Sequence, residues 1–137
     1  MPMPQWRIAA GCAAAAVLTI TGCGSLDERR TAASEAALAF EEALRTGDGA
    51  AACEALAPGT RDELVKSSGA LCPRAVLEEE LSPAGTVRRV DVHGRQARVR
   101  LAGDTLFLAG FDDGWKVVAA GCEPRPEQPY DCTVKGG

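Results

Sequence analysis

The fold is decided by the stretch TVRRVDVHGRQARVRLAGDTLFL, residues 86–108, in which apolar and polar side chains alternate. A period of two is typical of a β-strand with one buried face. His93-Gly94 and Gly103-Asp104 are candidate two-residue turns, because glycine and short acids are favoured in turns. The stretch therefore predicts three antiparallel strands joined by tight turns.

The register set by these turns can be tested by the side chains that it brings together. The first turn places Arg89 opposite Arg98, and the second places Leu101 opposite Leu106. The apolar side chains then share one face and the polar ones share the other, as a half-buried sheet requires. Residues 115–120 predict a further strand, so we expect about four strands.

Helical patterns fill the first half of the chain. In residues 31–45, apolar side chains recur at the three- and four-residue spacing of an amphipathic helix. Ser25 and Glu28 form a possible capping box that would let this helix begin earlier. Three shorter helices are expected to follow. Asp48 would cap the first, Thr60 and Glu63 would form a capping box for the second, and Pro73 would occupy the first turn of the third.

These patterns predict an α+β fold, with N-terminal helices packed on one face of a curved antiparallel sheet. The 137-residue chain has room for one domain, which we place at residues 31–137.

The N-terminus has the plan of a secretory signal peptide. Its uncharged, Ala-rich run of 13 residues, 8–20, is too short to span a bilayer. The run ends in Ile-Thr-Gly-Cys, which resembles the bacterial lipobox. By that resemblance residues 1–22 are removed, Cys23 is lipidated, and residues 23–30 form a lipidated tether to the outer face of the cell membrane. An ordinary secretory signal with a chance cysteine is the alternative.

The charge of the chain excludes two kinds of partner. Without residues 1–22, which carry one Arg and no acid, 14 Lys and Arg face 19 Asp and Glu. A nucleic-acid binder normally has a basic domain, so no nucleic acid is expected. Electrostatic adhesion to anionic lipid also needs clustered basic residues, so the attachment to the membrane must be covalent or hydrophobic, as a lipid anchor is.

Four cysteines remain for the exported domain, and an even number predicts two disulfides. Three connectivities are possible, and we favour neighbours: Cys53 with Cys72, and Cys122 with Cys132. Metal binding and thiol chemistry are disfavoured, because zinc ligands usually pair two to four residues apart and redox pairs use C-x-x-C.

The order of elements carries a resemblance to a known superfamily. Helices followed by an antiparallel meander, with Asp-Asp-Gly-Trp-Lys-Val-Val at residues 112–118, resemble the nuclear transport factor 2-like cone. The ending, from Ala-Ala-Gly-Cys at residues 119–122 to Cys132, resembles small actinobacterial lipoproteins of unassigned function. The resemblance covers roughly residues 31–137. It implies helices packed into the concave face of the sheet. Enzymes of the superfamily place an Asp, often with a His or Tyr, inside the cone.

That catalytic role cannot be carried over to this chain. The one histidine, His93, falls in a predicted turn, where we interpret it as a residue that tolerates positive φ. Asp104, Asp112 and Asp113 are also in predicted turns, where short acids bond the backbone. Trp115 is interpreted as a core residue. The sequence therefore predicts no catalytic residue, no cofactor and no metal.

Two features favour binding. Arg89, Arg98 and Arg100 share one face of the predicted sheet with Phe107, and the like-charge pair Arg89–Arg98 is unfavourable unless an anionic partner uses it. A solvated face relieved by a nearby acid is the alternative. The second feature is the Pro-rich loop at residues 123–131, with Tyr130 as its contact residue, although a purely structural clasp would serve equally well.

We therefore expect a membrane-anchored, non-catalytic lipoprotein of the cell envelope that binds an envelope protein or a small ligand. The alternatives are a cone-pocket enzyme of isomerase or cyclase type, and an inhibitor or immunity-like protein. A buried acid facing into a pocket would favour the enzyme, whereas an interior filled with Val and Leu would argue against it.

Overall fold

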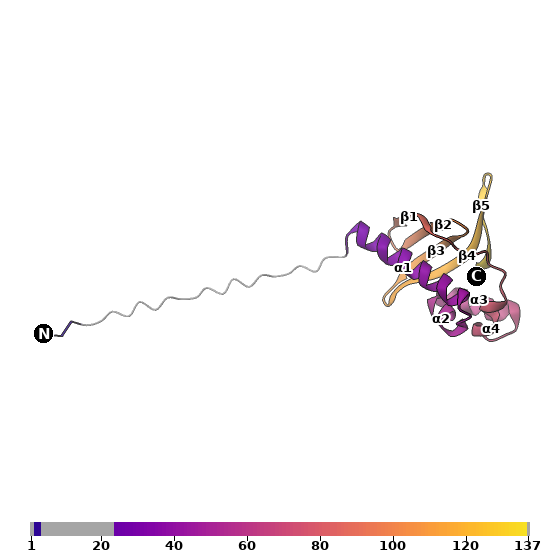
Figure 1. The fold of residues 1–137 in the computed structure, drawn as a ribbon, viewed down its shortest axis with the longest axis horizontal. Coiled ribbons are helices and arrows are strands. Elements are labelled where there is room, and N and C mark those ends of the chain that lie inside the picture. Colours follow the sequence, from indigo (N-terminus) through magenta and orange to yellow (C-terminus); the bar gives the residue numbers. More distant parts are fainter. Residues whose placement is uncertain (1, 4–23, 137) are drawn as a thin grey trace.

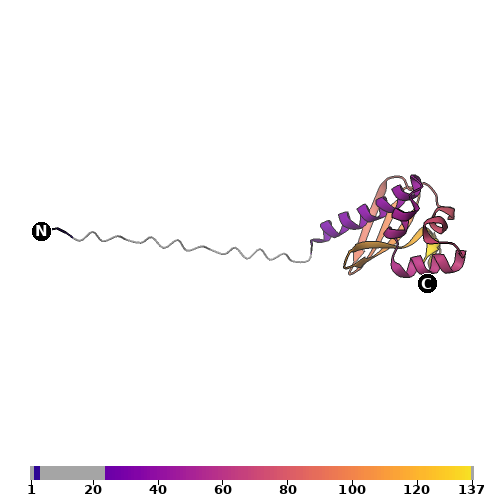
Figure 2. The same cartoon turned by 90° about the horizontal axis from the view of Figure 1, so that it is seen from below.

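The computed structural model describes residues 2–3 and 24–136 and is an α+β fold with four helices and five strands (Figure 1). The strands form one open antiparallel sheet in the order β1-β2-β3-β4-β5. Helix α1 crosses one face of this sheet, and α2, α3 and α4 gather at one end (Figures 1 and 2). The predicted α+β class with an antiparallel sheet is confirmed, with five strands in place of about four. The predicted signal peptide and Cys23 lie outside the described residues.

Helix α1 (Leu26–Arg45) begins at the capping box that the sequence predicted. The Ser25 hydroxyl accepts from the Glu28 backbone N–H, and the Glu28 carboxylate accepts from the Ser25 N–H, both at 3.1 Å. The helix therefore starts before residue 31, and the expected tether at residues 23–30 is helical from Leu26. The helix buries its predicted apolar stripe, since Ala33, Ala37 and Phe40 are fully inaccessible to solvent.

The short helices α2 (Gly49–Ala55), α3 (Pro58–Ser68) and α4 (Cys72–Glu78) follow. Asp48 caps α2 as expected, accepting from the Ala51 N–H at 3.1 Å. The predicted capping box at Thr60 is wrong, because α3 already begins at Pro58. Thr60 is instead buried inside the helix, where its hydroxyl donates to the Val118 carbonyl at 2.9 Å.

Strands β1 (Val87–His93), β2 (Gln96–Leu101) and β3 (Thr105–Phe111) form the predicted meander, but the predicted register is wrong. Arg98 lies opposite Asp91, and Leu106 lies opposite Val99. The first turn lies one residue later in the chain than expected, and the second lies one residue earlier. Each move displaces the pairing of the two strands by two residues. Because strand side chains alternate with a period of two, this displacement leaves every side chain on its predicted face.

Strands β4 (Gly114–Arg125) and β5 (Gln128–Lys135) form a hairpin that projects from the sheet (Figure 1). The expected Pro-rich loop at residues 123–131 is therefore a pair of strand ends. The prolines fit because Pro124 lies where the ladder register shifts, and Pro129 lies in the edge strand β5. Proline is tolerated at both kinds of position.

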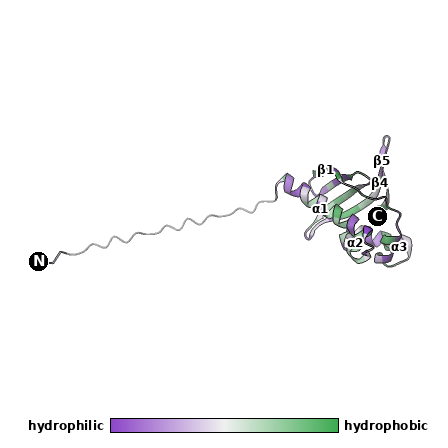
Figure 3. Ribbon diagram, in the orientation of Figure 1, coloured by the Kyte–Doolittle hydropathy of each residue, from purple (hydrophilic) through white to green (hydrophobic). Residues whose placement is uncertain are grey.

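The core fills the space between α1 and the sheet. Phe40 packs with the inward side chains of β2, β3 and β4, of which Val99, Leu106 and Val117 are completely buried. Figure 3 shows hydrophobic colouring along the strands, whereas the start of α1 and the tip of the β4–β5 hairpin are hydrophilic. The inner face of the sheet is thus occupied by Val and Leu side chains.

Both predicted disulfides are present. Cys53–Cys72 joins α2 to α4 with the Cα atoms 6.0 Å apart, and Cys122–Cys132 joins residues directly opposite in the β4–β5 ladder. The neighbour connectivity is therefore confirmed. Within the described part of the chain, no helix combines the length and apolar character needed to cross a bilayer.

Candidate functional site

A cleft of about 430 Å³ opens between the second half of α1, helix α4 and the irregular segment at residues 79–85. Its volume falls in the range of small-molecule sites, roughly 300–1,000 Å³. Apolar side chains make up most of its lining: Leu38, Leu44, Val76, Leu77, Leu81, Pro83 and Ala84. The cleft is therefore suited to the apolar part of a small ligand.

Glu41 is the buried acid that lines this cleft. Its side chain is 9 % exposed, and its Oε1 atom is buried without a hydrogen-bond donor. Burial, which disfavours the charged form, raises the pKa of Glu41 to about 8, and a hydrogen bond with Asp104 adds to the effect. Glu41 is thus protonated at neutral pH.

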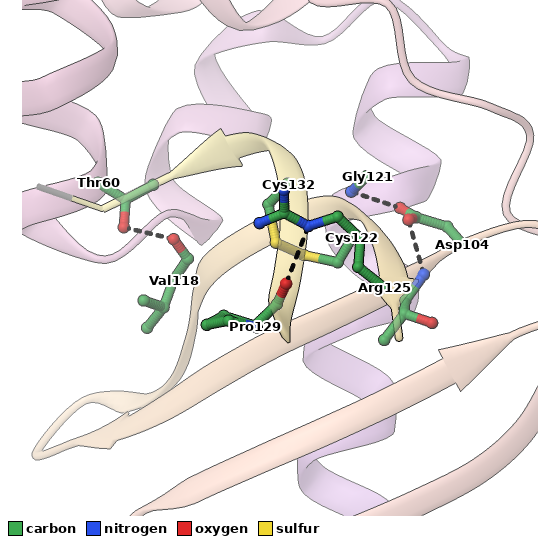
Figure 4. The surroundings of a disulfide bond; sticks show 9 residues. Thr60, Asp104, Val118, Gly121, Cys122, Arg125, Pro129 and Cys132 are labelled. Carbon is green, nitrogen blue, oxygen red and sulfur yellow. Dashed lines mark hydrogen bonds between the residues drawn. A yellow bond between two sulfur atoms is a disulfide. The ribbon is translucent and has the colours of Figure 1, made fainter. Parts of the chain in front are cut away.

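The Asp104 carboxylate is held in the β2–β3 turn by two backbone amides. Its Oδ1 accepts from the Thr105 N–H at 2.7 Å, and its Oδ2 accepts from the Gly121 N–H at 3.2 Å (Figure 4). Backbone donors of this kind stabilise a negative charge. Asp104 therefore has two backbone donors besides its hydrogen bond with Glu41.

The wall of the cleft at residues 81–85 is fixed to the same turn. The Gly103 N–H donates to the Ala84 carbonyl at 2.8 Å. A Cβ atom at Gly103 would lie 2.0 Å from the Pro83 carbonyl oxygen, so only glycine allows this approach. Because Asp104 follows Gly103, the turn that positions the acid pair also positions the cleft wall.

The other charged side chains that line the cleft are mainly acidic. Glu42 accepts from the Arg45 guanidinium at 2.8 and 2.5 Å, which neutralises the one cation. Glu79 adds a further carboxylate. With Asp104 beneath, the cleft has a negative potential that favours cationic ligands over anionic ones.

The predicted binding residues lie away from this cleft, on the sheet. Arg98 donates to Asp91 at 2.8 Å, and Arg89 donates to the same carboxylate at 2.9 Å. These two hydrogen bonds lower the pKa of Asp91 to about 2, and the bond from Arg98 has the larger effect. The expected Arg89–Arg98 pair is wrong, since Arg89 lies opposite Arg100. Asp91 therefore relieves the positive charge of Arg98 on this face.

Phe107 and Tyr130 complete this cluster on the sheet. Their rings meet edge to face with centroids 5.1 Å apart, and the Tyr130 hydroxyl lies 3.4 Å from an Arg98 guanidinium nitrogen. Four of the five predicted binding residues are thus brought together. Among the described residues Arg100 makes no ion pair.

His93 and Trp115 have structural positions. His93 ends β1 opposite Gln96, and the positive φ of 57° belongs to Gly94, so the interpretation of His93 as the positive-φ turn residue is wrong. Trp115 packs against the core, as predicted, with the Arg29 guanidinium carbon 5.9 Å from its ring centroid.

Sequence reasoning missed Glu41, although a signal was present. Glu41 lies four residues after Ala37 and three before Leu44, both on the apolar stripe of the helix. A charged residue inside such a stripe faces the buried side and needs an explanation. Asp104 was recognised only as a turn residue that bonds the backbone, which it also is.

No family model, curated protein or solved structure matches this chain. Within residues 24–136 and 2–3, no three His, Cys, Asp or Glu side chains come together as metal ligands would.

Proposed function

We propose that this chain is a lipoprotein held at the outer face of the cell membrane through Cys23, where its domain binds a small ligand in the cleft beside Glu41 without transforming it. The Ile-Thr-Gly-Cys sequence at residues 20–23 supports the address. The two disulfides fit an oxidising compartment. A nuclear transport factor 2-like origin of the domain remains part of this proposal.

The observation that carries the binding function is the combination of an apolar cleft with one buried, unpaired polar atom. The Glu41 Oε1 atom lacks a donor among the described residues, and leaving such an atom unsatisfied costs about 1–3 kcal/mol. A ligand with an N–H or O–H group at this depth would recover that energy. The apolar lining supplies affinity, and the acid supplies orientation.

A native mass spectrum of the full chain, purified from its own envelope, tests this function. We expect a bound small molecule that is lost in Leu77→Trp, because Leu77 lines the cleft and is 41 % exposed, so that a larger side chain can enter the cleft. Leu71→Trp is the matched control, since Leu71 is 80 % exposed and outside the cleft lining. Equal ligand occupancy in both variants would exclude the cleft as the site.

Binding of an envelope protein is a second candidate, supported by the cluster of Arg98, Phe107 and Tyr130. Tyrosine and arginine are enriched at the centres of protein interfaces. We expect Tyr130→Ala combined with Arg100→Glu to abolish capture of that partner from envelope extracts, while Lys66→Glu on α3 has no effect. If the double variant still captures the partner, the cluster is only a solvated surface.

A catalytic role is the weaker alternative. The Glu41–Asp104 pair resembles a general acid with its partner, and a pKa of about 8 for Glu41 is near the working range of such a group. Against this role, the inner face of the sheet, where a cone enzyme would hold its substrate, is filled by Val99, Leu106 and Val117.

A further inference from the structure

We propose that the cleft beside Glu41 takes an organic amine, whose ammonium group pairs with the Glu41 carboxylate while the Glu41 proton is released to solvent. The inference rests on the proposed function, that the cleft binds a small ligand, and it names the class of that ligand. The only bond that breaks is the carboxyl O–H of Glu41, whose proton passes to water, and an ammonium N–H takes its place as the hydrogen-bond donor.

The charge around Glu41 selects a cation. From α1 the cleft receives Glu42 and Arg45, which neutralise each other through two hydrogen bonds. The segment at residues 79–85 contributes Glu79, the β2–β3 turn contributes Asp104, and the α4 residues that line the cleft are apolar. An anionic ligand would therefore meet uncompensated carboxylates, whereas an ammonium group is attracted by them.

The hydrogen-bonding groups select a donor. The buried Oε1 atom of Glu41 is an acceptor without a partner, and Asp104 already accepts from two backbone amides. An ammonium group offers three donors and no acceptor, which matches this inventory. A carboxylate or ether would bring only further acceptors.

The walls of the cleft require an apolar body on the amine. Leu38 and Leu44 from α1, Val76 and Leu77 from α4, and Leu81 and Pro83 from the connecting segment enclose the remaining volume. Burying apolar surface against these side chains contributes roughly 25 cal/mol per Å². A compact cyclic amine is therefore a suitable probe.

Proton release gives the inference a measurable signature. With a pKa of about 8, Glu41 is about nine-tenths protonated at pH 7, so each amine bound there should release close to one proton. At pH 9 about one-tenth of a proton remains to be released. By linkage, the affinity for the amine should fall about tenfold for each pH unit below the pKa, because protons compete with the amine for Glu41.

The test is isothermal titration calorimetry of the full chain in zwitterionic nanodiscs, with empty nanodiscs subtracted. Cyclohexylamine, cyclohexanol and cyclohexanecarboxylate are titrated at pH 7 in buffers of different ionisation enthalpy, which reports the protons released. We expect cyclohexylamine to bind at least tenfold more tightly than the other two, with close to one proton released.

Two variants assign the effect to Glu41. Glu41→Gln keeps the size of the side chain but has no proton to lose, so it should abolish proton release and weaken amine binding at least tenfold. Glu35→Gln makes the same substitution at an exposed position on the same helix, outside the cleft, and should change neither quantity.

The outcomes separate this inference from the proposed function. Equal or tighter binding of cyclohexanol or cyclohexanecarboxylate overturns the amine and leaves the cleft as a ligand site. Amine binding without proton release in the parent chain overturns the role of Glu41, whether or not the variant folds. If no probe binds, the amine is overturned, and the proposed function fails with it only when the native mass spectrum is also empty.

Discussion

Glu41 makes the stability of the domain depend on pH. Its pKa rises from 4.5 to about 8 on folding, so the folded state keeps a proton that the unfolded state loses across this range. Stability from this group is therefore complete below pH 4.5 and falls by about 1 kcal/mol per pH unit up to pH 8. Glu41→Gln should remove that loss, because its amide can still donate to Asp104.

Urea unfolding at pH 5 and pH 8 measures the effect. We expect the advantage of Glu41→Gln over the parent to grow by about 3 kcal/mol between these values, while Glu35→Gln tracks the parent. An advantage that does not change with pH would mean that Glu41 is ionised in the folded state.

Asp91 has the opposite dependence. Its pKa falls from 3.8 to about 2 on folding because Arg98 and Arg89 donate to its carboxylate. The stability that it contributes is present above pH 3.8 and is lost as the pH falls towards 2. Asp91→Asn should therefore be less stable than the parent at pH 6 and equal to it near pH 2, in urea unfolding followed by circular dichroism. Asp113→Asn, in an exposed turn, should show no such convergence.

The same residues mark what the sequence could predict at this scale. The sequence predicted correctly which side chains share a face of the sheet, because an error of two residues in the strand register leaves the faces unchanged. Phe107 was therefore correctly placed on the same face as Arg98. The partner of Arg98 was not predictable, since it depends on whether the turn is made by residues 93–94 or by residues 94–95. Glu41 could have been found from its helical neighbours alone.

At the scale of elements, α2 and α4 approach so closely that one position must be glycine. A Cβ atom at Gly49 would lie 2.1 Å from the Pro73 carbonyl oxygen, which is backbone and cannot rotate away. Gly49→Ala should therefore destabilise the domain by about 2 kcal/mol or more, measured by thermal unfolding. Gly59→Ala is the matched control, because nothing lies within 4 Å of its added Cβ; there we expect no loss, or a gain of up to about 1 kcal/mol.

Helix starts were predicted well where a side chain makes the cap, as at Ser25 and Asp48. They were predicted poorly where tertiary contacts decide: Thr60 looks like a cap in sequence, but its hydroxyl bonds the Val118 carbonyl of a strand far along the chain. Residues 123–131, the end of β4 and the start of β5, were read as a loop, and prolines are usually excluded from sheets. Edge positions and register shifts, which admit them, are not visible in sequence.

At the scale of the whole molecule, Cys53–Cys72 links α2 to the helix that forms one side of the cleft. Replacing both cysteines by serine removes a cross-link across 19 residues, which should cost about 3 kcal/mol of unfolding free energy. Thermal unfolding of Cys53→Ser/Cys72→Ser checks this value. A melting temperature equal to that of the parent would show that packing alone holds the helices together.

Attachment to the membrane can be tested on the same chain. We expect Cys23→Ser to be recovered from the medium or the soluble fraction, while the parent stays with membranes and gains the mass of a lipid. Cys12→Ser, inside the predicted signal peptide, should leave the attachment unchanged. Retention of Cys23→Ser at the membrane with an unprocessed leader would refute the proposed address.

The early start of α1 limits how far the domain can move from such an attachment. Only Gly24 and Ser25 separate Cys23 from the helix, a span of about 10 Å when extended. The helix itself has 20 residues and is about 30 Å long, with the cleft along its second half. The binding site would then sample the layer just above the lipid headgroups. Amphiphilic molecules that leave the bilayer would reach it before those dissolved in the surrounding water.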